Sequence, residues 1–167
     1  IKTSADTIEG NQASCLLGRS VSTAGDVNDD GYSDVIIGAN IYDKGQLNEG
    51  VALIYYGSSS GMVTTSADTL EMNQANANFG FSVSTAGDVN GDGYDDVIVG
   101  TVYYNNGNGQ EGAAFVYYGS ISGIRNYSDK FVCNQSGAKM GRSVSFAGDV
   151  NGDGYSDVIV GASEYDH

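Results

Sequence analysis

Hydrophobic and polar positions alternate over short segments of the chain, and glycine-rich or asparagine-rich turns separate these segments. Alternation with a period of two is typical of β-strands, because successive side chains point to opposite faces of a sheet. No apolar spacing of 3.6 residues continues long enough to indicate a helix. The pattern therefore predicts an all-β protein. In and just after the second of the repeats described next, the predicted strands are 81–86, 96–100, 113–118 and 130–134.

The strand pattern belongs to an internal repeat of about 60 residues. The segment GRSVSTAGDVNDDGYSDVIIG begins at Gly18 and returns with few changes at Gly80 and Gly141, at spacings of 62 and 61 residues. A second segment, GVALIYYGS from Gly50, returns as GAAFVYYGS from Gly112 and is missing from the third copy. The chain therefore divides into repeat units 1–62, 63–123 and a truncated 124–167.

Four short antiparallel strands in each repeat are typical of a β-propeller blade, in which each blade buries its faces against its neighbours. Propellers arrange about four to eight such blades around a channel. Two complete repeats and part of a third are too few to close a ring, so we expect an incomplete ring of four-stranded antiparallel blades. Other blades, from a longer chain or from another copy of this chain, would complete it.

Each repeat carries one acidic loop of the form Asp-x-Asn-x-Asp-Gly-x-x-Asp. Oxygen-bearing side chains stand at loop positions 1, 3, 5 and 9, the glycine at position 6 permits a sharp turn, and the backbone carbonyl at position 7 can also face an ion. This all-oxygen set favours Ca²⁺ over Mg²⁺, which keeps several waters, and over Zn²⁺, which prefers nitrogen and sulfur. The three predicted calcium sites are Asp26, Asn28, Asp30, Tyr32 and Asp34; Asp88, Asn90, Asp92, Tyr94 and Asp96; and Asp149, Asn151, Asp153, Tyr155 and Asp157.

An EF-hand loop opens with the same residues but requires a bidentate acid at position 12 and flanking helices. Position 12 holds Ile37, Val99 and Val160 here, and the residues after position 9 have the pattern of a buried strand. Acidic turns that only solubilise a surface would not return three times with the same spacing of oxygen ligands. The sequence therefore indicates a metal loop between two strands.

The net charge of the chain agrees with a cationic partner. Its 167 residues include 21 acidic and 7 basic residues, for a formal net charge of −14. This balance argues against nucleic acid and anionic membranes as partners, because both require a basic patch. No run of about 18 apolar residues indicates a membrane span. Two of the basic residues, Arg19 and Arg142, follow the repeated glycine where the second repeat has Phe81, and we interpret them as surface residues.

Few residues could support catalysis. Every clustered pair of carboxylates belongs to a repeated loop, and catalytic groups are seldom copied three times. His167 is the only histidine, so neither a histidine-based triad nor a zinc site can be built. Cys15 and Cys133 are interpreted as unpaired, buried small hydrophobic residues, with no base nearby for covalent catalysis. The sequence therefore predicts a binding module and not an enzyme.

These features resemble the FG-GAP repeat family, which includes the seven-bladed propeller of integrin α subunits and many bacterial surface proteins. The resemblance covers nearly the whole chain, although no copy has the proline of the family's Gly-Ala-Pro segment. It implies that the calcium loops join the first and second strands of each blade on one face. The matching residues are Phe79-Gly80, with Leu17-Gly18 and Met140-Gly141 as weaker versions, and the segments that begin at Gly38, Gly100 and Gly161.

The resemblance also implies that partners bind the face opposite the calcium loops. Loops 40–49 and 101–111 and the shorter loops between blades are expected on that face. The implied function is an extracellular module, secreted or at the cell surface, for cell adhesion or protein interaction, in which Ca²⁺ rigidifies the blade loops. The alternative is a carbohydrate-binding propeller, free-standing or appended to a secreted hydrolase, in which loop tyrosines such as Tyr103 and Tyr104 contact a glycan.

Overall fold

The structure is a computed structural model and describes residues 7–65, 68–125 and 128–166. The residues in these ranges form β-strands and no helix, so the prediction of an all-β protein is confirmed. The same ranges hold no helix that could cross a bilayer. The strands are β1 Leu17–Gly25, β2 Asp34–Ala39, β3 Val51–Tyr55, β4 Asp68–Leu70, β5 Phe79–Gly87, β6 Asp96–Thr101, β7 Ala113–Tyr117, β8 Ser128–Phe131, β9 Met140–Gly148 and β10 Asp157–Ala162.

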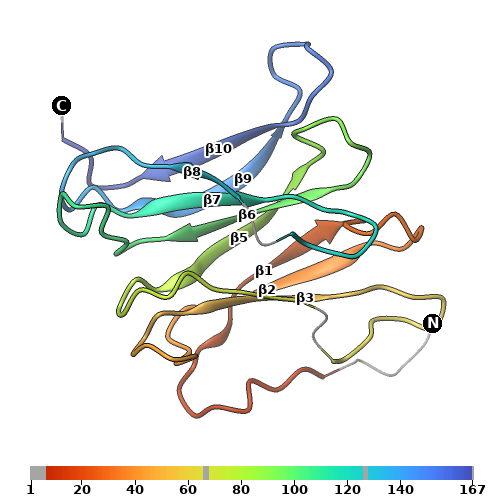
Figure 1. Cartoon of the computed structure of the whole chain (residues 1–167), viewed down its shortest axis with the longest axis horizontal. Coiled ribbons are helices and arrows are strands. Elements are labelled where there is room, and N and C mark those ends of the chain that lie inside the picture. Colours follow the sequence, from red (N-terminus) through yellow and green to blue (C-terminus); the bar gives the residue numbers. More distant parts are fainter. Residues whose placement is uncertain (1–6, 66–67, 126–127, 167) are drawn as a thin grey trace.

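The strands form three antiparallel sheets that lie side by side (Figure 1). Strands β1 to β4 form the first sheet and β5 to β8 the second, each in chain order, and β9 pairs with β10 in the third. The first strands of the three sheets are neighbours, since β5 contacts both β1 and β9. The described strands close no ring, which confirms the prediction of propeller blades in an incomplete ring.

The strands of the second sheet differ from the predicted ones mainly at their ends. Strand β5 begins at Phe79, two residues before the predicted start, and β8 covers Ser128–Phe131 instead of 130–134. Asn134 has a φ of 56°, in the left-handed region, which extended backbone does not occupy. In both four-stranded sheets the last strand lies beyond the repeat boundary at residue 62 or 123, so each sheet takes its fourth strand from the following repeat unit.

The second sheet is the best buried part of the molecule because it has a neighbour on each face. All six residues of β6 are buried. Val97 and Val99 belong to a core shared with the first sheet, whereas Ile98 packs in a cluster that Val158 and Val160 of β10 also contact. Burial of apolar surface is the main stabilising contribution to such cores, at about 25 cal/mol per Å².

Glycines allow adjacent sheets to approach closely. A Cβ on Gly38 would lie 2.0 Å from the carbonyl oxygen of Gly80, and a Cβ on Gly80 would lie 2.3 Å from the carbonyl oxygen of Val51. Gly100 and Gly141 repeat the first of these contacts at 2.0 Å between the second and third sheets. The glycine of the Phe-Gly pair and that of the Gly-Ala segment therefore meet across the boundary between two blades, where no side chain fits.

Phe79, the aromatic residue of the Phe-Gly pair, is fully buried between the first two sheets. Its ring makes edge-to-face contacts with Phe115 and Tyr117, at centroid distances of 6.2 and 6.0 Å. Such pairs stabilise by about 0.5–1.5 kcal/mol beyond the burial of their area. The Phe-Gly pair thus provides both a core residue and a close backbone contact between sheets.

Candidate metal centre

The three acidic loops connect β1 to β2, β5 to β6 and β9 to β10, and they lie at the same end of the sheets, at the right of Figure 1. Consecutive loops also contact each other through their backbones. The N–H of Asp95 donates to the carbonyl of Asp26 at 3.1 Å, and the N–H of Ser156 donates to the carbonyl of Asp88 at 2.9 Å. Each contact involves the carbonyl of a residue at loop position 1, so the acidic loops link neighbouring sheets.

Inside each loop, the side chains at positions 1, 3 and 5 fold over the loop's own backbone. In the first loop, the Asp26 carboxylate accepts hydrogen bonds from the N–H groups of Asp30 at 3.1 Å and Gly31 at 2.8 Å. The Asn28 Oδ1 atom accepts from the same Asp30 N–H at 3.1 Å, and Asp30 Oδ1 accepts from Tyr32 N–H at 3.0 Å. The same bonds recur in the second and third loops, so the repeated sequence produces a repeated geometry.

The loop backbone is left-handed at two positions. The glycine at position 6 has a φ of 87° in the first loop (Gly31), as the sequence predicted. Position 4 is also left-handed, at a φ of 75° in Gly91 and 76° in Gly152, which the sequence analysis did not anticipate. The first loop has Asp29 there, at a φ of 56°. Glycine adopts this conformation without steric cost, so the backbone at position 4 is more strained in the first loop, at Asp29, than in the other two loops.

The aspartate at position 9 begins the second strand of its sheet and ties the loop to that sheet. Asp34 and Asp96 are buried. The Asp96 carboxylate accepts hydrogen bonds from the N–H groups of Val89 and Gly119, both at 2.9 Å, and Asp34 has the equivalent pair of donors. Asp157 accepts from Val150 N–H at 2.8 Å and is only half-buried. Position 9 therefore joins the loop to the end of the third strand in the two four-stranded sheets.

Burial makes the position 9 carboxylates costly to ionise. The pKa of Asp96 is raised to about 6, mainly because burial removes the carboxylate from water; the N–H groups of Gly119 and Val89 oppose this rise, and the negative charges of Asp92 and Asp88 add to it. Burial likewise raises the pKa of Asp34, with smaller contributions from Asp30 and Asp26. A buried carboxylate beside two others favours a cation, because a cation supplies the charge that the neighbouring N–H dipoles only partly balance.

The donor set of each loop fits a hard cation, since it consists of three carboxylates and one amide oxygen. In the part of the chain that the structure describes, no three histidine, cysteine, aspartate or glutamate side chains are already gathered closely enough to hold a metal ion. The carboxylates instead accept hydrogen bonds from backbone N–H groups, and Asp88 Oδ1 and Asp149 Oδ1 accept two each. The three calcium sites thus stay a prediction, supported by their chemistry.

The backbone of the position 7 tyrosines follows the same pattern, because their N–H groups donate to the carboxylate at position 5 in all three loops. The rings of Tyr32 and Tyr155 are exposed, and that of Tyr94 is half-buried. The Tyr155 ring lies against the second acidic loop, where a Cβ on Gly91 would come within 2.6 Å of it. The predicted ligand at position 7 is the backbone carbonyl.

Loops at the opposite end of the sheets also bind one another. The Asn76 N–H donates to the Leu47 carbonyl at 2.7 Å, which joins the loop between β4 and β5 to the loop between β2 and β3. A fully buried carboxylate lies there that was not predicted from the sequence: Glu49, whose Oε1 atom accepts from the N–H groups of Lys44 and Gln46 at 2.6 and 3.1 Å. The signal was the repeated Glu-Gly pair, which returns at Glu111.

Two of the other interpretations can be compared with the structure. Tyr104, expected as a glycan contact, packs edge-to-face on Phe115 at 5.4 Å, whereas the Tyr103 side chain is 37% exposed. Cys15 and Cys133 are both unpaired, as predicted, but Cys133 is half-exposed and not buried. Tyr103 is therefore the tyrosine of this loop that presents the more accessible ring.

The sequence matches known proteins over most of its length. The FG-GAP repeat model matches residues 17–55, 79–117 and 140–167. Integrin alpha-5 of Xenopus laevis is 31% identical over 162 residues, and integrin alpha-V of Gallus gallus is 30% identical over 164, each across 92% of this chain and 15% of the relative. Integrin alpha pat-2 of Caenorhabditis briggsae is 34% identical over 155 residues, 82% of this chain and 12% of the relative. The chain thus spans about a seventh of the length of these relatives, and it belongs to the FG-GAP repeat family.

Proposed function

We propose that the chain is part of a calcium-binding β-propeller that serves cell adhesion or protein interaction outside the cell, and that it is not an enzyme. The observation that carries the proposal is the arrangement of the acidic loops. Each loop presents three carboxylates, and its first residue accepts a hydrogen bond from the next loop wherever a next loop is described. An ion bound in such a loop would stiffen a contact between two blades, not only a turn.

The energetic contribution of calcium follows from mass action. Three bound Ca²⁺ ions would change the formal net charge from −14 to about −8 and relieve repulsion among the nine ligand aspartates. At about 1 mM free Ca²⁺ and an affinity near 10 μM, each site would add roughly 2.7 kcal/mol to the free energy of unfolding. Cytosolic calcium is too low for such sites to fill, which supports a secreted or cell-surface location.

The integrin alpha relatives support a role in adhesion or protein interaction. We place the partner on the face opposite the acidic loops, where the long loops between the second and third strands of each sheet differ most between repeats. Other propeller blades, from a longer chain or from a second copy, would cover the open faces of the first and third sheets, where Val21 and Ile159 are 64% and 62% exposed.

A second candidate function is glycan recognition by the same face. The observation that favours it is the exposed ring of Tyr103, beside the Asn- and Gly-rich run 105–109. Binding on a glycan array that is lost in Tyr103→Ala and kept in Tyr42→Ala would favour a carbohydrate-binding propeller over a protein-binding one.

Thermal unfolding with and without EDTA tests the proposed calcium role. We expect a large drop in Tm on chelation, full recovery after excess Ca²⁺ is added back, and little recovery with the same concentration of Mg²⁺. An unchanged Tm in EDTA would contradict the proposal, because three unneutralised clusters of carboxylates would then cost nothing.

A further inference from the structure

The first strands of the three sheets carry a basic cluster at the end opposite the acidic loops. Arg19, Phe81 and Arg142 are the third residues of β1, β5 and β9, directly after the repeated glycine. Because these three strands are neighbours, the topology brings the three equivalent residues together. They line a hollow of about 320 Å³ together with the serine that follows each of them and with Val83 and Val144. We call this hollow the arginine pocket.

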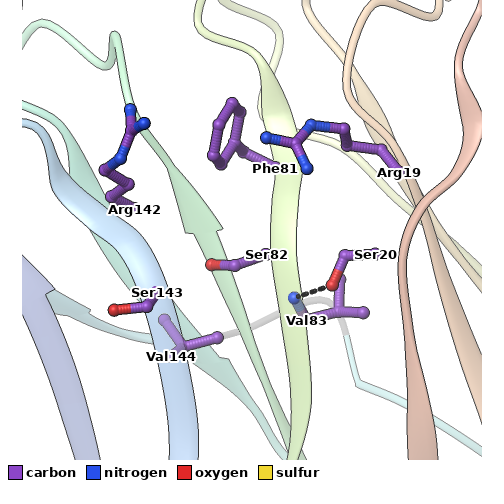
Figure 2. A pocket seen from close by; sticks show the side chains of 8 residues that line it. All are labelled: Arg19, Ser20, Phe81, Ser82, Val83, Arg142, Ser143 and Val144. Atoms are coloured by element: carbon purple, nitrogen blue, oxygen red, sulfur yellow. Dashed lines mark hydrogen bonds between the residues drawn. The ribbon is translucent and has the colours of Figure 1, made fainter.

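The two guanidinium groups lie on either side of one aromatic ring. Figure 2 shows the Phe81 ring between the side chains of Arg19 and Arg142. The Cζ atom of Arg19 is 4.1 Å from the ring centroid, and the Cζ atom of Arg142 is 5.8 Å from it. The guanidiniums are therefore no more than about 10 Å apart, and the cation–π contacts with Phe81 hold both at the same opening.

Neither guanidinium has an acidic partner among the residues that the structure describes. Although the chain has three times as many acidic as basic residues, no carboxylate of residues 7–65, 68–125 and 128–166 lies within ion-pair distance of Arg19 or Arg142. Both side chains are exposed, whereas Lys44 and Lys139 pair with Glu71 and Glu164. Two like charges that are held together without a counter-ion favour an anion that could bind both.

The serines below the arginines do not compensate for this charge. The Ser20 hydroxyl oxygen accepts a hydrogen bond from the Val83 N–H at 3.0 Å, and the Ser82 hydroxyl donates to the Gly141 carbonyl at 2.8 Å. These bonds join neighbouring sheets and fix the floor of the arginine pocket; Figure 2 shows the bond between Ser20 and Val83. The guanidinium groups above that floor are left to face solvent with their N–H donors.

We propose that the arginine pocket binds a carboxylate side chain from an acidic peptide segment of a protein partner. Arginine pairs with carboxylates through two parallel N–H···O bonds, and two guanidiniums around one opening can hold one or two such groups. A sugar would need an open aromatic face to stack on, and Arg19 covers a face of Phe81. This inference deepens the proposed protein-interaction function, since it specifies the chemistry that the partner brings to one part of that face.

Binding of a fluorescently labelled dodecapeptide of glutamate, followed by anisotropy in 1 mM Ca²⁺ and 150 mM NaCl, tests the inference. We expect the chain to bind this peptide and not a glutamine dodecapeptide, and we expect Arg19→Gln/Arg142→Gln to weaken binding at least tenfold. The matched control Lys44→Gln/Arg125→Gln removes two exposed positive charges elsewhere and should change the Kd less than twofold. Phe81→Leu keeps an apolar residue but removes the ring, and should weaken binding several-fold.

Three results would overturn the inference. The first is absence of peptide binding, and the second is an equal loss of affinity in both double variants. The third is displacement of the labelled peptide by an oligogalacturonate at a lower concentration than the unlabelled peptide needs, which would identify a glycan anion as the ligand. Melting of each variant with calcium and with EDTA separates this test from that of the proposed function. If the variants melt normally in calcium but both double variants bind the peptide equally well, the arginine pocket alone is refuted. If the Tm does not depend on calcium, the calcium role is refuted.

Discussion

Strands β6 and β10 have nearly the same sequence, DVIVGT and DVIVGA, but very different surroundings. All six residues of β6 are buried, and Ile98 has no exposed surface. In β10 no residue is fully buried, and Ile159, which corresponds to Ile98, is 62% exposed. The burial of a repeat residue therefore depends on the sheets on either side of it, and its own sequence only makes that burial possible.

The same contrast extends to the acidic loops. In the second loop, the carboxylate at position 9, Asp96, is held by N–H groups of Val89 and Gly119, and Gly119 follows the third strand of its sheet. The third loop has the same predicted ligand residues, but Asp157 is held by Val150 alone among the donors the structure describes. Two loops of equal composition should then differ in how strongly they are coupled to the rest of the fold.

Truncation of the matched isoleucines in β6 and β10 should give the largest difference in stability between the two strands. We expect Ile98→Ala to lower the free energy of unfolding by about 2–5 kcal/mol, because it leaves a cavity between two sheets. Ile159→Ala should cost less than about 1 kcal/mol, since its side chain is mostly in solvent. Chemical denaturation in saturating Ca²⁺ measures both values, and equal losses would mean that β10 is covered in solution.

Removal of the predicted position 9 ligand from the second or third loop compares how strongly each loop is coupled to its sheet. Asp96→Asn and Asp157→Asn should each reduce the number of bound Ca²⁺ ions by one. The loss of stability should be larger for Asp96→Asn, at roughly 2.7 kcal/mol at Ca²⁺ 100-fold above the Kd, because its loop is tied to a complete sheet. Calorimetric titration gives the number of sites, and denaturation in Ca²⁺ gives the stability. Unchanged stoichiometry in either variant would refute the ligand assignment.

The raised pKa of Asp96 predicts a pH dependence in the calcium-free chain. Burial raises this pKa to about 6, whereas an unfolded aspartate titrates near 3.9. The folded state therefore binds the proton of Asp96 more tightly than the unfolded state does. The resulting contribution to the free energy of unfolding is fully present below about pH 4 and is lost as the pH rises through 6. In EDTA, lowering the pH from 7.5 to 5.5 should add about 1 kcal/mol to the free energy of unfolding.

Asp96→Asn is the control for this pH effect, since it removes the titrating group and keeps the side-chain size. The variant should lose the increment that we attribute to Asp96, while the contributions of the other carboxylates remain. The same pH dependence in both proteins would assign the effect to the general repulsion of a chain with a net charge of −14 instead.

The smallest predicted effect concerns loop position 4, where the first loop has Asp29 and the other two have glycine. Asp29→Gly removes a side chain from a left-handed residue and should raise the free energy of unfolding by up to about 1 kcal/mol. Thermal unfolding in Ca²⁺ detects this change. A lower Tm would mean that the Asp29 side chain makes a compensating contribution to its loop.

Local sequence patterns were sufficient to predict the strands and the turns of the acidic loops. Alternation gives the strands their two faces, and Gly31 at position 6 permits the turn that folds Asp26 over the loop. These features depend on residues close together in the chain, so one repeat already contains the information. The ends of strands were less accurate, because residues such as Asn134 leave the extended region without a strong sequence signal.

Contacts between sheets could not be predicted in the same way. The unequal surroundings of Asp96 and Asp157 depend on Gly119, which has no counterpart in the truncated third repeat. The arginine pocket joins Arg19, Phe81 and Arg142, which are about 60 residues apart; the sequence showed that they occupy equivalent repeat positions but indicated only a surface role for the two arginines. Such features arise only when the repeats are placed beside one another.

Calorimetric titration of the EDTA-stripped chain with Ca²⁺ shows whether each repeat holds one calcium ion. We expect three ions bound per chain, with little heat from the same titration with Mg²⁺. Binding of no Ca²⁺, or equal binding of Mg²⁺, would contradict the assignment of these acidic loops as calcium sites.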